Sequence, residues 1–308
     1  MRPIPPSRPN VYTGSPVDRV SERRDDEAFI AGAFAAADSL FLPVWRSRSL
    51  VRGMDANAPE AVFLVGDAAA HLRGADASWA FLGLHEGRPV FAVDVSHHED
   101  PLPLLPETLG TLLDIRTTAG LLPRDDAAML AHARGLMHWR GRHRFCGVCG
   151  GPCIPRSAGN AMACTVCDTQ HFPRTDPAVI MLVTNGGEAL LGHSQRFPNS
   201  TMYSTLAGFV EPGESLEEAV AREVFEEAGV RVGEVYYHSS QPWPFPASIM
   251  LGFHAQALTT EITIDPGELR DARWFSADEM RHCADHGFQL PRADSIARRL
   301  IEDWLDTV

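Results

Sequence analysis

Seven glutamates and one arginine crowd residues 208–230 (GFVEPGESLEEAVAREVFEEAGV). A run of acids is usually a solvated surface. Here Ser215 and Glu218 form an S-x-x-E capping box, so a helix is predicted to begin at residue 216 and to end at Gly229. At the spacing of a core-facing stripe, this helix carries first apolar residues and then carboxylates, in the order Leu216, Ala219, Val220, Glu223, Glu226 and Glu227.

The three carboxylates on this predicted inward face require a cation. They lie near the carboxyl end of the helix, where the macrodipole disfavours negative charge, and partly buried like charges repel one another. Oxygen-only ligands on a rigid helix suit Mg²⁺ or Mn²⁺. Such a centre can hold a pyrophosphate, polarise its phosphorus and activate a water molecule. We therefore expect Glu223, Glu226 and Glu227 to bind a catalytic divalent metal.

Five of the six cysteines fall between residues 146 and 167. Four of them form two CxxC pairs that 14 residues separate, namely Cys146, Cys149, Cys164 and Cys167. Two such pairs place four thiolates around Zn²⁺ and leave no open coordination position, which indicates a structural zinc ribbon. Cys153 could replace a neighbouring ligand, but its spacing is poorer. We expect Cys153 and Cys283 to be packed or idle thiols.

A third candidate site is the segment SQPWPFPAS at residues 240–248. Prolines on alternate positions fix an extended backbone, so Trp243 and Phe245 would stand as rigid planes between the hydrogen-bonding ends Gln241 and Ser248. A slot of this kind suits a flat nucleobase or a nicotinamide ring. On composition alone, an edge loop that packs its aromatic rings into the core fits the segment equally well.

The acidic stretch resembles the Nudix box, GX5EX7REUXEEXGU. Gly208, Glu214 and the run at residues 222–230 occupy every defined position of this 23-residue pattern. The resemblance implies a hydrolase that acts on a nucleoside diphosphate linked to another moiety. It also implies a Nudix domain, an α/β/α sandwich with a mixed sheet.

The same resemblance assigns roles to the residues of the box. Glu223 and Glu227 would be the principal metal ligands, and Glu226 a further ligand or the group that activates water. Arg222 and Glu214 would pair and orient the helix against the preceding loop. The general base varies among such enzymes, so its identity stays open.

Two further features resemble the NADH pyrophosphatase branch of the Nudix hydrolases. One is the SQPWPFPxS segment shortly after the box, and the other is a zinc ribbon just upstream, followed by HFPR at residues 171–174. The match is good from about residue 130 onward and general before it. It implies cleavage of NAD(H) to NMN(H) and AMP, a homodimer and, in bacterial members, removal of the NAD cap from RNA.

This branch implies additional site residues. The Ala207 carbonyl and Glu268 would complete the metal shell, although Glu268 also fits an ordinary turn carboxylate. Gly159 stands where a relative has a substrate-contacting Glu, so contacts from the zinc loop are not carried over. The residues implied in substrate binding are Phe172, which would stack on a base, Gln241, Pro242, Trp243, Pro244, Phe245, Pro246, Ala247, Ser248 and Ala297 of the last helix.

The composition limits the class of partner. Acidic residues outnumber basic ones by 40 to 27, the net charge is −13, and every basic residue is an arginine. This balance argues against a nucleic-acid coat or a basic membrane-surface protein, and the lack of lysine excludes catalytic lysine chemistry. No window approaches the length of a membrane span and no apolar signal segment begins the sequence, so we expect a cytoplasmic protein.

The length of 308 residues predicts two or three domains. The expected order is a disordered or extended segment over residues 1–25, an N-terminal domain with a linking helix over 26–140, the zinc ribbon over 141–172 and the Nudix domain over 173–308. The N-terminal domain is expected to be mixed α/β and largely β, because short apolar runs at 61–66, 79–84 and 89–95 alternate with turns. We expect Asp125 or Asp126 to cap the linking helix.

In the last domain, apolar runs at 178–183 and 188–193 flank Asn185-Gly186, a strong hairpin signal. Further elements are predicted as strands near 232–239 and 248–258 and a final helix over 293–306.

Two alternatives remain open. The substrate could be another dinucleotide, such as ADP-ribose or diadenosine polyphosphate. The protein could also be a non-catalytic RNA-binding module, since residues 137–174 hold five arginines and one aspartate. Four thiolates and Zn²⁺ would lower that local charge to about +2, which is small for strong nonspecific affinity.

Overall fold

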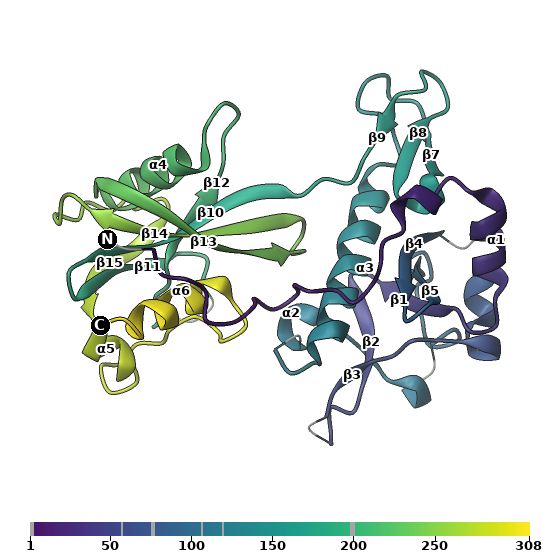
Figure 1. Cartoon of the computed structure of the whole chain (residues 1–308), viewed down its shortest axis with the longest axis horizontal. Coiled ribbons are helices and arrows are strands. Elements are labelled where there is room, and N and C mark those ends of the chain that lie inside the picture. Colours follow the sequence, from purple (N-terminus) through teal and green to yellow (C-terminus); the bar gives the residue numbers. More distant parts are fainter. Residues whose placement is uncertain (1–2, 57, 75–77, 106, 119, 198–200) are drawn as a thin grey trace. The chain divides into compact units, whose positions relative to one another are not determined.

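The computed structural model describes residues 3–56, 58–74, 78–105, 107–118, 120–197 and 201–308 (Figure 1). The chain forms two compact units. Unit 1 comprises the described residues of 1–11 with 176–242 and 248–308, and unit 2 comprises the described residues of 12–175 with 243–247. None of the helices in the described ranges combines the length and the apolar character needed to cross a bilayer.

Unit 1 is built on a mixed sheet with the strand order β13-β14-β10-β11-β15, and β12 also pairs with β10. Strand β10 runs parallel to β14 and antiparallel to β11 and β12. The elements are β10 (Asp176–Asn185), β11 (Glu188–Ser194), β12 (Leu206–Phe209), α4 (Leu216–Ala228), β13 (Val232–Trp243), β14 (Ser248–Ala257), β15 (Leu269–Ser276), α5 (Ala277–Arg281) and α6 (Ile296–Leu305).

Helices cover both faces of this sheet because β10 is apolar on both sides. Successive side chains of a strand point to opposite faces. Val179 packs in one core with Val220 of α4, whereas Ile180 packs in a second core with Leu300 of α6. Figure 1 shows α4 and α6 on opposite sides of the sheet. The predicted α/β/α sandwich with a mixed sheet is confirmed.

Unit 2 begins with a second mixed sheet, in the order β3-β2-β1-β5-β4, with β6 paired to β2. Strands β1 and β5 are parallel, and a core that includes Phe41, Phe81 and Phe91 lies against the sheet. The elements are η1 (Ser21–Arg23), α1 (Glu27–Ala35), β1 (Leu40–Trp45), β2 (Arg48–Arg52), β3 (Glu60–Ala61), η2 (Gly66–Arg73), β4 (Ser78–His85), β5 (Arg88–Asp94), η3 (Glu107–Leu109), β6 (Thr111–Leu113), α2 (Ile115–Thr118) and α3 (Arg124–Arg142).

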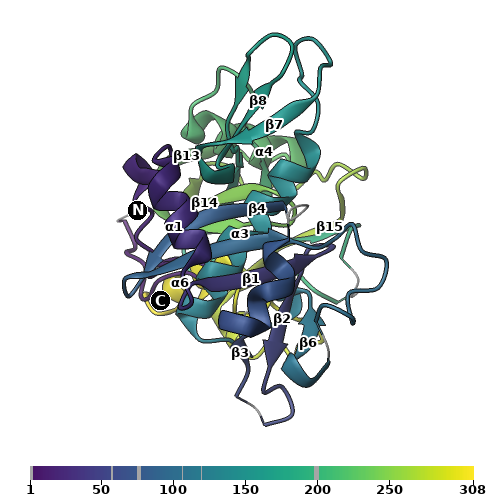
Figure 2. The same cartoon turned by 90° about the vertical axis from the view of Figure 1, so that its right-hand side faces the viewer.

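The zinc-ribbon segment follows α3 within the same unit. Its three strands form a small antiparallel sheet in the order β7-β8-β9. Figure 2 shows β7 and β8 projecting from one end of the unit. The elements are β7 (Cys153–Arg156), η4 (Ser157–Gly159), β8 (Ala161–Cys164) and β9 (Gln170–His171).

In the N-terminal domain, one apolar run is only partly a strand, and the predicted helix cap was wrong. The run at 61–66 is not a continuous strand, because β3 ends at Ala61 and Gly66, with a φ of 54°, turns the chain into η2. Helix α3 is capped by Pro123 without a side-chain hydrogen bond. Asp126 lies inside the first turn and accepts the Ala61 N–H at 2.7 Å, so it ties the helix to β3.

Two boundaries in unit 1 also differ from the predictions. The hairpin between β10 and β11 is present, but Asn185 pairs with Glu188, so its two-residue turn is Gly186-Gly187. Helix α6 begins at Ile296 because the Ser295 side chain caps it by accepting the Arg298 N–H, three residues later than expected.

Candidate active site

Helix α4 forms for local reasons that the sequence already displays. Ser215 accepts the Glu218 N–H, and the Glu218 side chain accepts the Ser215 N–H in return. At the other end Gly229 adopts a left-handed conformation, with a φ of 70°, and donates its N–H to the Phe225 carbonyl. The capping prediction is confirmed, and these two ends fix which turns of the helix carry the carboxylates.

The helix presents its glutamates at three different depths. Glu227 is buried, with 7% of its surface exposed, and the Glu223 side chain is 14% exposed. The Glu226 side chain is 57% exposed, so the prediction that it faces inward with the others was wrong. Val224 and Ala228 occupy the buried face instead, because each residue advances the helix by about 100° and Glu226 falls outside that arc.

Arg222 connects the loop before α4 to two glutamates of the helix. It contacts both carboxylate oxygens of Glu214, and its Nη2 also donates to the Phe209 carbonyl at 2.9 Å. Its Nη1 donates to Glu223 at 2.8 Å and to Glu226 at 2.9 Å. Hydrogen bonds from Arg222 lower the pKa of Glu214 to about 2. The structure thus brings together the predicted pair and joins two further carboxylates to it.

Glu227 is the most perturbed acid of the cluster. Burial raises the pKa of Glu227 to about 8, and the negative charge of Glu223 adds to this effect. The Ala207 N–H approaches the Glu227 carboxylate at 3.4 Å and acts in the opposite direction. A carboxylate held in this way favours either a proton or a metal cation.

The first glycine of the box has a steric purpose. A Cβ atom at Gly208 would lie 1.9 Å from the Glu223 carboxyl carbon and about as close to both of its oxygens. The Glu223 carboxylate therefore occupies the space next to the backbone of β12, which a larger residue at 208 would fill. The oxygen-only donor set, the space for Glu223 and the raised pKa of Glu227 all fit a divalent cation.

The two residues predicted to complete the metal shell lie in the same unit. Ala207 is exposed on β12, next to Gly208. Burial is the main cause of the raised pKa of Glu223 and Glu227, and the charge of Glu268 adds to both, so the three carboxylates are electrostatic neighbours. Glu268 is half exposed and faces Arg196 at 3.7 Å.

In unit 1, the predicted substrate segment is braced rather than open. Gln241 has no exposed surface, its Nε2 donates to the Val11 and Asp294 carbonyls, and its Oε1 accepts the Ile296 N–H. Its amide is thereby committed to main-chain partners. Ala297 is buried in the α6 core, and Pro242 and Ser248 are partly buried.

The rest of the segment belongs to unit 2. Trp243 and Phe245 are partly exposed, and each ring meets Tyr12 edge-on. Arg134 of α3 donates to the Pro244 carbonyl at 2.8 Å and lies 4.8 Å above the Phe245 ring. Pro244 is buried, Ala247 is partly buried and Pro246 is exposed, as is Phe172 near the ribbon.

The four predicted zinc ligands meet in unit 2. The ligand atoms of Cys146, Cys149, Cys164 and Cys167 all lie within 4.8 Å of one another, the one such cluster of His, Cys, Asp or Glu ligands among the described residues. Backbone N–H groups two residues after Cys146 and Cys164 point at their sulfurs at 3.4 Å. Cys153 lies outside the cluster, and Cys283 packs beside the α6 core.

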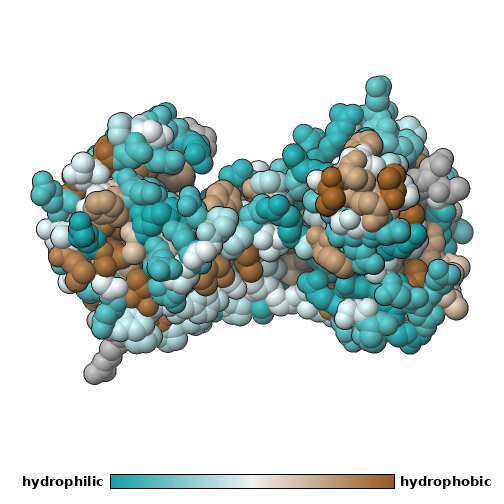
Figure 3. Space-filling model, turned by 90° about the horizontal axis from the view of Figure 1, so that it is seen from above, coloured by the Kyte–Doolittle hydropathy of each residue, from teal (hydrophilic) through white to brown (hydrophobic). Residues whose placement is uncertain are grey.

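The ribbon has little apolar interior apart from this cluster. Phe145, Val148 and Val166 are between 61% and 74% exposed. Figure 3, which views the molecule from the side where β7–β9 protrude in Figure 1, shows brown side chains there. A segment this small that exposes its apolar residues requires a metal or another staple to stay folded.

Sequence reasoning missed several supporting residues. The Nε2 atom of His171 lies 3.4 Å from the Cys146 sulfur. The residue is visible in the HFPR run, but its spacing from the cysteines fits no metal-ligand pattern. Arg134 is distant in sequence from the loop it holds. Gly159 has a φ of 84°, and a Cβ there would lie 2.6 Å from the Trp79 carbonyl, so a Glu at this position would displace β4.

Comparison with known families agrees with this geometry. Residues 174–303 match the family described as the NUDIX domain. Residues 142–172 match the NADH pyrophosphatase zinc ribbon domain, and residues 38–139 match the NADH pyrophosphatase-like rudimentary NUDIX domain. Two of these three families are thus described by NADH pyrophosphatase, and both matches precede the NUDIX match in the chain.

Similar proteins occur in bacteria and animals. The NAD-capped RNA hydrolase NudC of Stutzerimonas stutzeri (strain A1501) is 50% identical over 58% of this chain and 61% of its own length. The human NAD-capped RNA hydrolase NUDT12 is 36% identical over 74% of this chain and 50% of its own. A crystal structure of a NUDIX hydrolase from Nitrosomonas europaea matches 48% of this chain and 97% of its own, with 24% identity and a TM-score of 0.40. The chain thus spans less than two thirds of the length of these two relatives.

Proposed function

We propose that this protein is a divalent-metal-dependent hydrolase that cleaves the pyrophosphate of NAD(H) to give NMN(H) and AMP. The observation that carries the proposal is the placement of Glu223 and Glu227 against Ala207 and Gly208, with Arg222 fixing the helix. The family membership and the names of the relatives support the same chemistry.

Mg²⁺ or Mn²⁺ is the cofactor that this oxygen-only donor set suits. When bound, it would polarise the pyrophosphate and lower the pKa of a coordinated water molecule. Glu223, Glu227, Glu268 and the Ala207 carbonyl are the proposed ligands. Glu226 is exposed and hydrogen-bonded to Arg222, which suits a supporting ligand or a proton acceptor. The identity of the general base stays open.

The chain's own residues would perform two tasks during hydrolysis. Arg222 keeps Glu214 and Glu223 in fixed positions, so the metal ligands need no rearrangement on binding. Burial raises the pKa of Glu227, so its carboxyl group holds a proton in the absence of metal. A metal ion would displace that proton on binding. The first effect lowers the cost of assembling the site, and the second couples metal binding to the release of a proton.

The dinucleotide would be held by residues of the SQPWPFPAS segment, together with Phe172 and Ala297. Trp243 and Phe245 offer partly exposed rings for a base or a nicotinamide. Gln241 would act by fixing the backbone of the segment, because its amide has no free hydrogen-bonding group directed to solvent. The relatives named as NAD-capped RNA hydrolases extend the proposal to removal of the NAD cap from RNA.

The cysteine cluster would bind a structural Zn²⁺, because four thiolates leave no open position. A cytoplasmic location is part of the proposal, because cysteines clustered at metal-ligand distances are typical of proteins in a reducing compartment. We also propose a homodimer, which the mass of the protein in solution tests directly.

A turnover assay on parallel substrates tests the proposal. NADH, NAD⁺, NAD-capped RNA and ADP-ribose are incubated with Mg²⁺ or Mn²⁺, and the products are identified. We expect NMNH and AMP from NADH, and 5′-monophosphate RNA from the capped RNA. A kcat/KM for ADP-ribose far above that for NADH would replace the substrate assignment. Tight RNA binding without hydrolysis of any substrate would favour the RNA-binding alternative.

A further inference from the structure

Residues 10–12 contact residues 239–245, in and beside the substrate segment, although more than 220 positions separate them in sequence, and residues 7 and 8 contact α6. We infer that these residues form a positioning strap for the SQPWPFPAS segment, with Asn10 and Tyr12 as its two contact points. The strap lies outside the three matched family domains, the first of which begins at residue 38. Its effect on substrate binding rests on the proposed function.

The first contact point lies in unit 1. Asn10 is 5% exposed and uses its Nδ2 to donate to the Ser239 Oγ and to the Ser240 carbonyl, both at 2.9 Å. The next residue, Val11, accepts the Gln241 Nε2 at 3.2 Å. Three consecutive residues at the end of β13 are therefore bonded to two consecutive residues of the strap.

Gln241 carries this constraint onward to α6. Its Nε2 also donates to the Asp294 carbonyl, and its Oε1 accepts the Ile296 N–H, both at 2.8 Å. Ile296 is the first residue of α6, and Ala297 follows it. A shift of the strap would therefore move the start of the segment and the start of α6 together.

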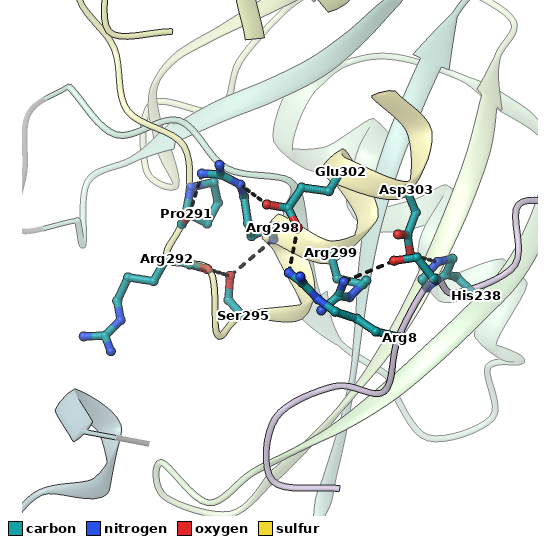
Figure 4. Close-up of polar contacts among 10 residues, drawn as sticks. Arg8, His238, Pro291, Arg292, Ser295, Arg298, Arg299, Glu302 and Asp303 are labelled. Atoms are coloured by element: carbon teal, nitrogen blue, oxygen red, sulfur yellow. Dashed lines mark hydrogen bonds and ion pairs between the residues drawn. The ribbon is translucent and has the colours of Figure 1, made fainter. Parts of the chain in front are cut away.

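A buried anchor holds the other end of the strap. The Ser7 N–H donates to Asp303 of α6 at 3.1 Å, and Arg299 donates to the Ser7 Oγ at 3.2 Å. The same Asp303 oxygen lies 2.9 Å from Nε2 of His238, and neither side chain is more than 2% exposed. Figure 4 shows this group between α6 and the strap, with Arg8 reaching Glu302.

The second contact point lies in unit 2. Tyr12 is 3% exposed, and its hydroxyl donates to the Ile115 carbonyl at 3.3 Å. Its ring meets Trp243 edge-on at 6.3 Å and Phe245 edge-on at 5.7 Å. The strap thus limits the orientation of the two rings that the proposed function assigns to the base or nicotinamide.

The test compares Asn10→Ala and Tyr12→Ala with the wild type in NADH turnover. Loss of either contact point loosens the segment without touching the metal ligands, so we expect KM for NADH to rise about 10-fold while kcat changes less than about 2-fold. Tyr12→Phe keeps the ring and should retain a KM near the wild-type value. Arg52→Gln removes only an exposed ion pair with Glu60, away from the strap, and serves as the matched control with an unchanged KM.

Hydrogen exchange of the substrate-free protein separates this inference from the proposed function. Asn10→Ala should speed exchange of the peptide over residues 239–248 and of the Ile296 amide, and leave residues 178–194 unchanged. If the wild type does not hydrolyse NADH, the substrate assignment fails while the exchange result still tests the strap. Wild-type KM together with wild-type exchange in Asn10→Ala would overturn the inference.

Discussion

In α4, the carboxylates are held in place by packing against a sheet, whereas in the ribbon the cysteines have main-chain hydrogen bonds but little apolar packing around them. Val220 and Val224 bury the inner face of α4, and Arg222 ties two acids of the helix and Glu214 of the preceding loop to one guanidinium. The ribbon instead exposes Val148 and Val166 and has the sulfur cluster at its centre. This difference predicts that the first site would be preorganised for an exchangeable metal, and that the second would depend on a metal that stays bound.

The largest expected effect is the loss of the ribbon when zinc is removed. Structural zinc contributes roughly 10–16 kcal/mol to the folding of small zinc domains, so stripping the metal or replacing Cys164 with Ala should unfold residues 144–172. Hydrogen exchange measures this directly. The β10–β14 sheet should keep its protection, and equal loss in both regions would contradict the contrast between them.

Gly208→Ala should damage the active site without unfolding it. The new Cβ would displace the Glu223 carboxylate, so we expect kcat to fall by about 100-fold and the Mg²⁺ requirement to rise, because metal positioning supplies several kcal/mol to such reactions. Gly187→Ala is the matched control, because a Cβ there meets no atom within 4 Å. Turnover at increasing Mg²⁺ distinguishes the two, and equal kcat values would refute the steric role.

The pH dependence of stability should differ between wild type and Glu227→Gln. Burial raises the pKa of Glu227 from 4.5 to about 8, so in metal-free protein the folded state keeps a proton that the unfolded state loses. The free energy of unfolding should therefore fall as the pH rises from about 4.5 to 8, and the variant should lack this component. Denaturant titrations at several pH values in EDTA measure it. Added Mg²⁺ should oppose the loss.

Glu226→Gln should have the smallest effect. Its side chain is more than half exposed and its ion pair with Arg222 is of the surface type, so the expected change in the free energy of unfolding is about 0.5 kcal/mol. Thermal unfolding measures this change. A loss of stability as large as that of Val224→Ala would show that Glu226 is packed in the protein.

The structural features that could be predicted are those determined by residues close together in sequence. The capping box, Gly229 and the two CxxC pairs each act within a few residues, so α4 and the cysteine cluster were correctly anticipated. The exposure of Glu226 was not predicted correctly. Glu223, Glu226 and Glu227 lie within five positions, and the sequence does not show which of them face the sheet. The brace around Gln241 depends on partners near residues 11, 294 and 296, and no local pattern encodes such distant pairing.

The most direct test of the account compares Glu227→Gln with Glu217→Gln in NADH turnover at saturating Mg²⁺. Both residues lie on α4, but Glu217 is exposed on its outer side. We predict that Glu227→Gln lowers kcat by at least about 100-fold while the fold is retained, and that Glu217→Gln hydrolyses NADH to NMNH and AMP like the wild type. Full turnover by Glu227→Gln would contradict the assignment of α4 as the metal-binding catalytic element.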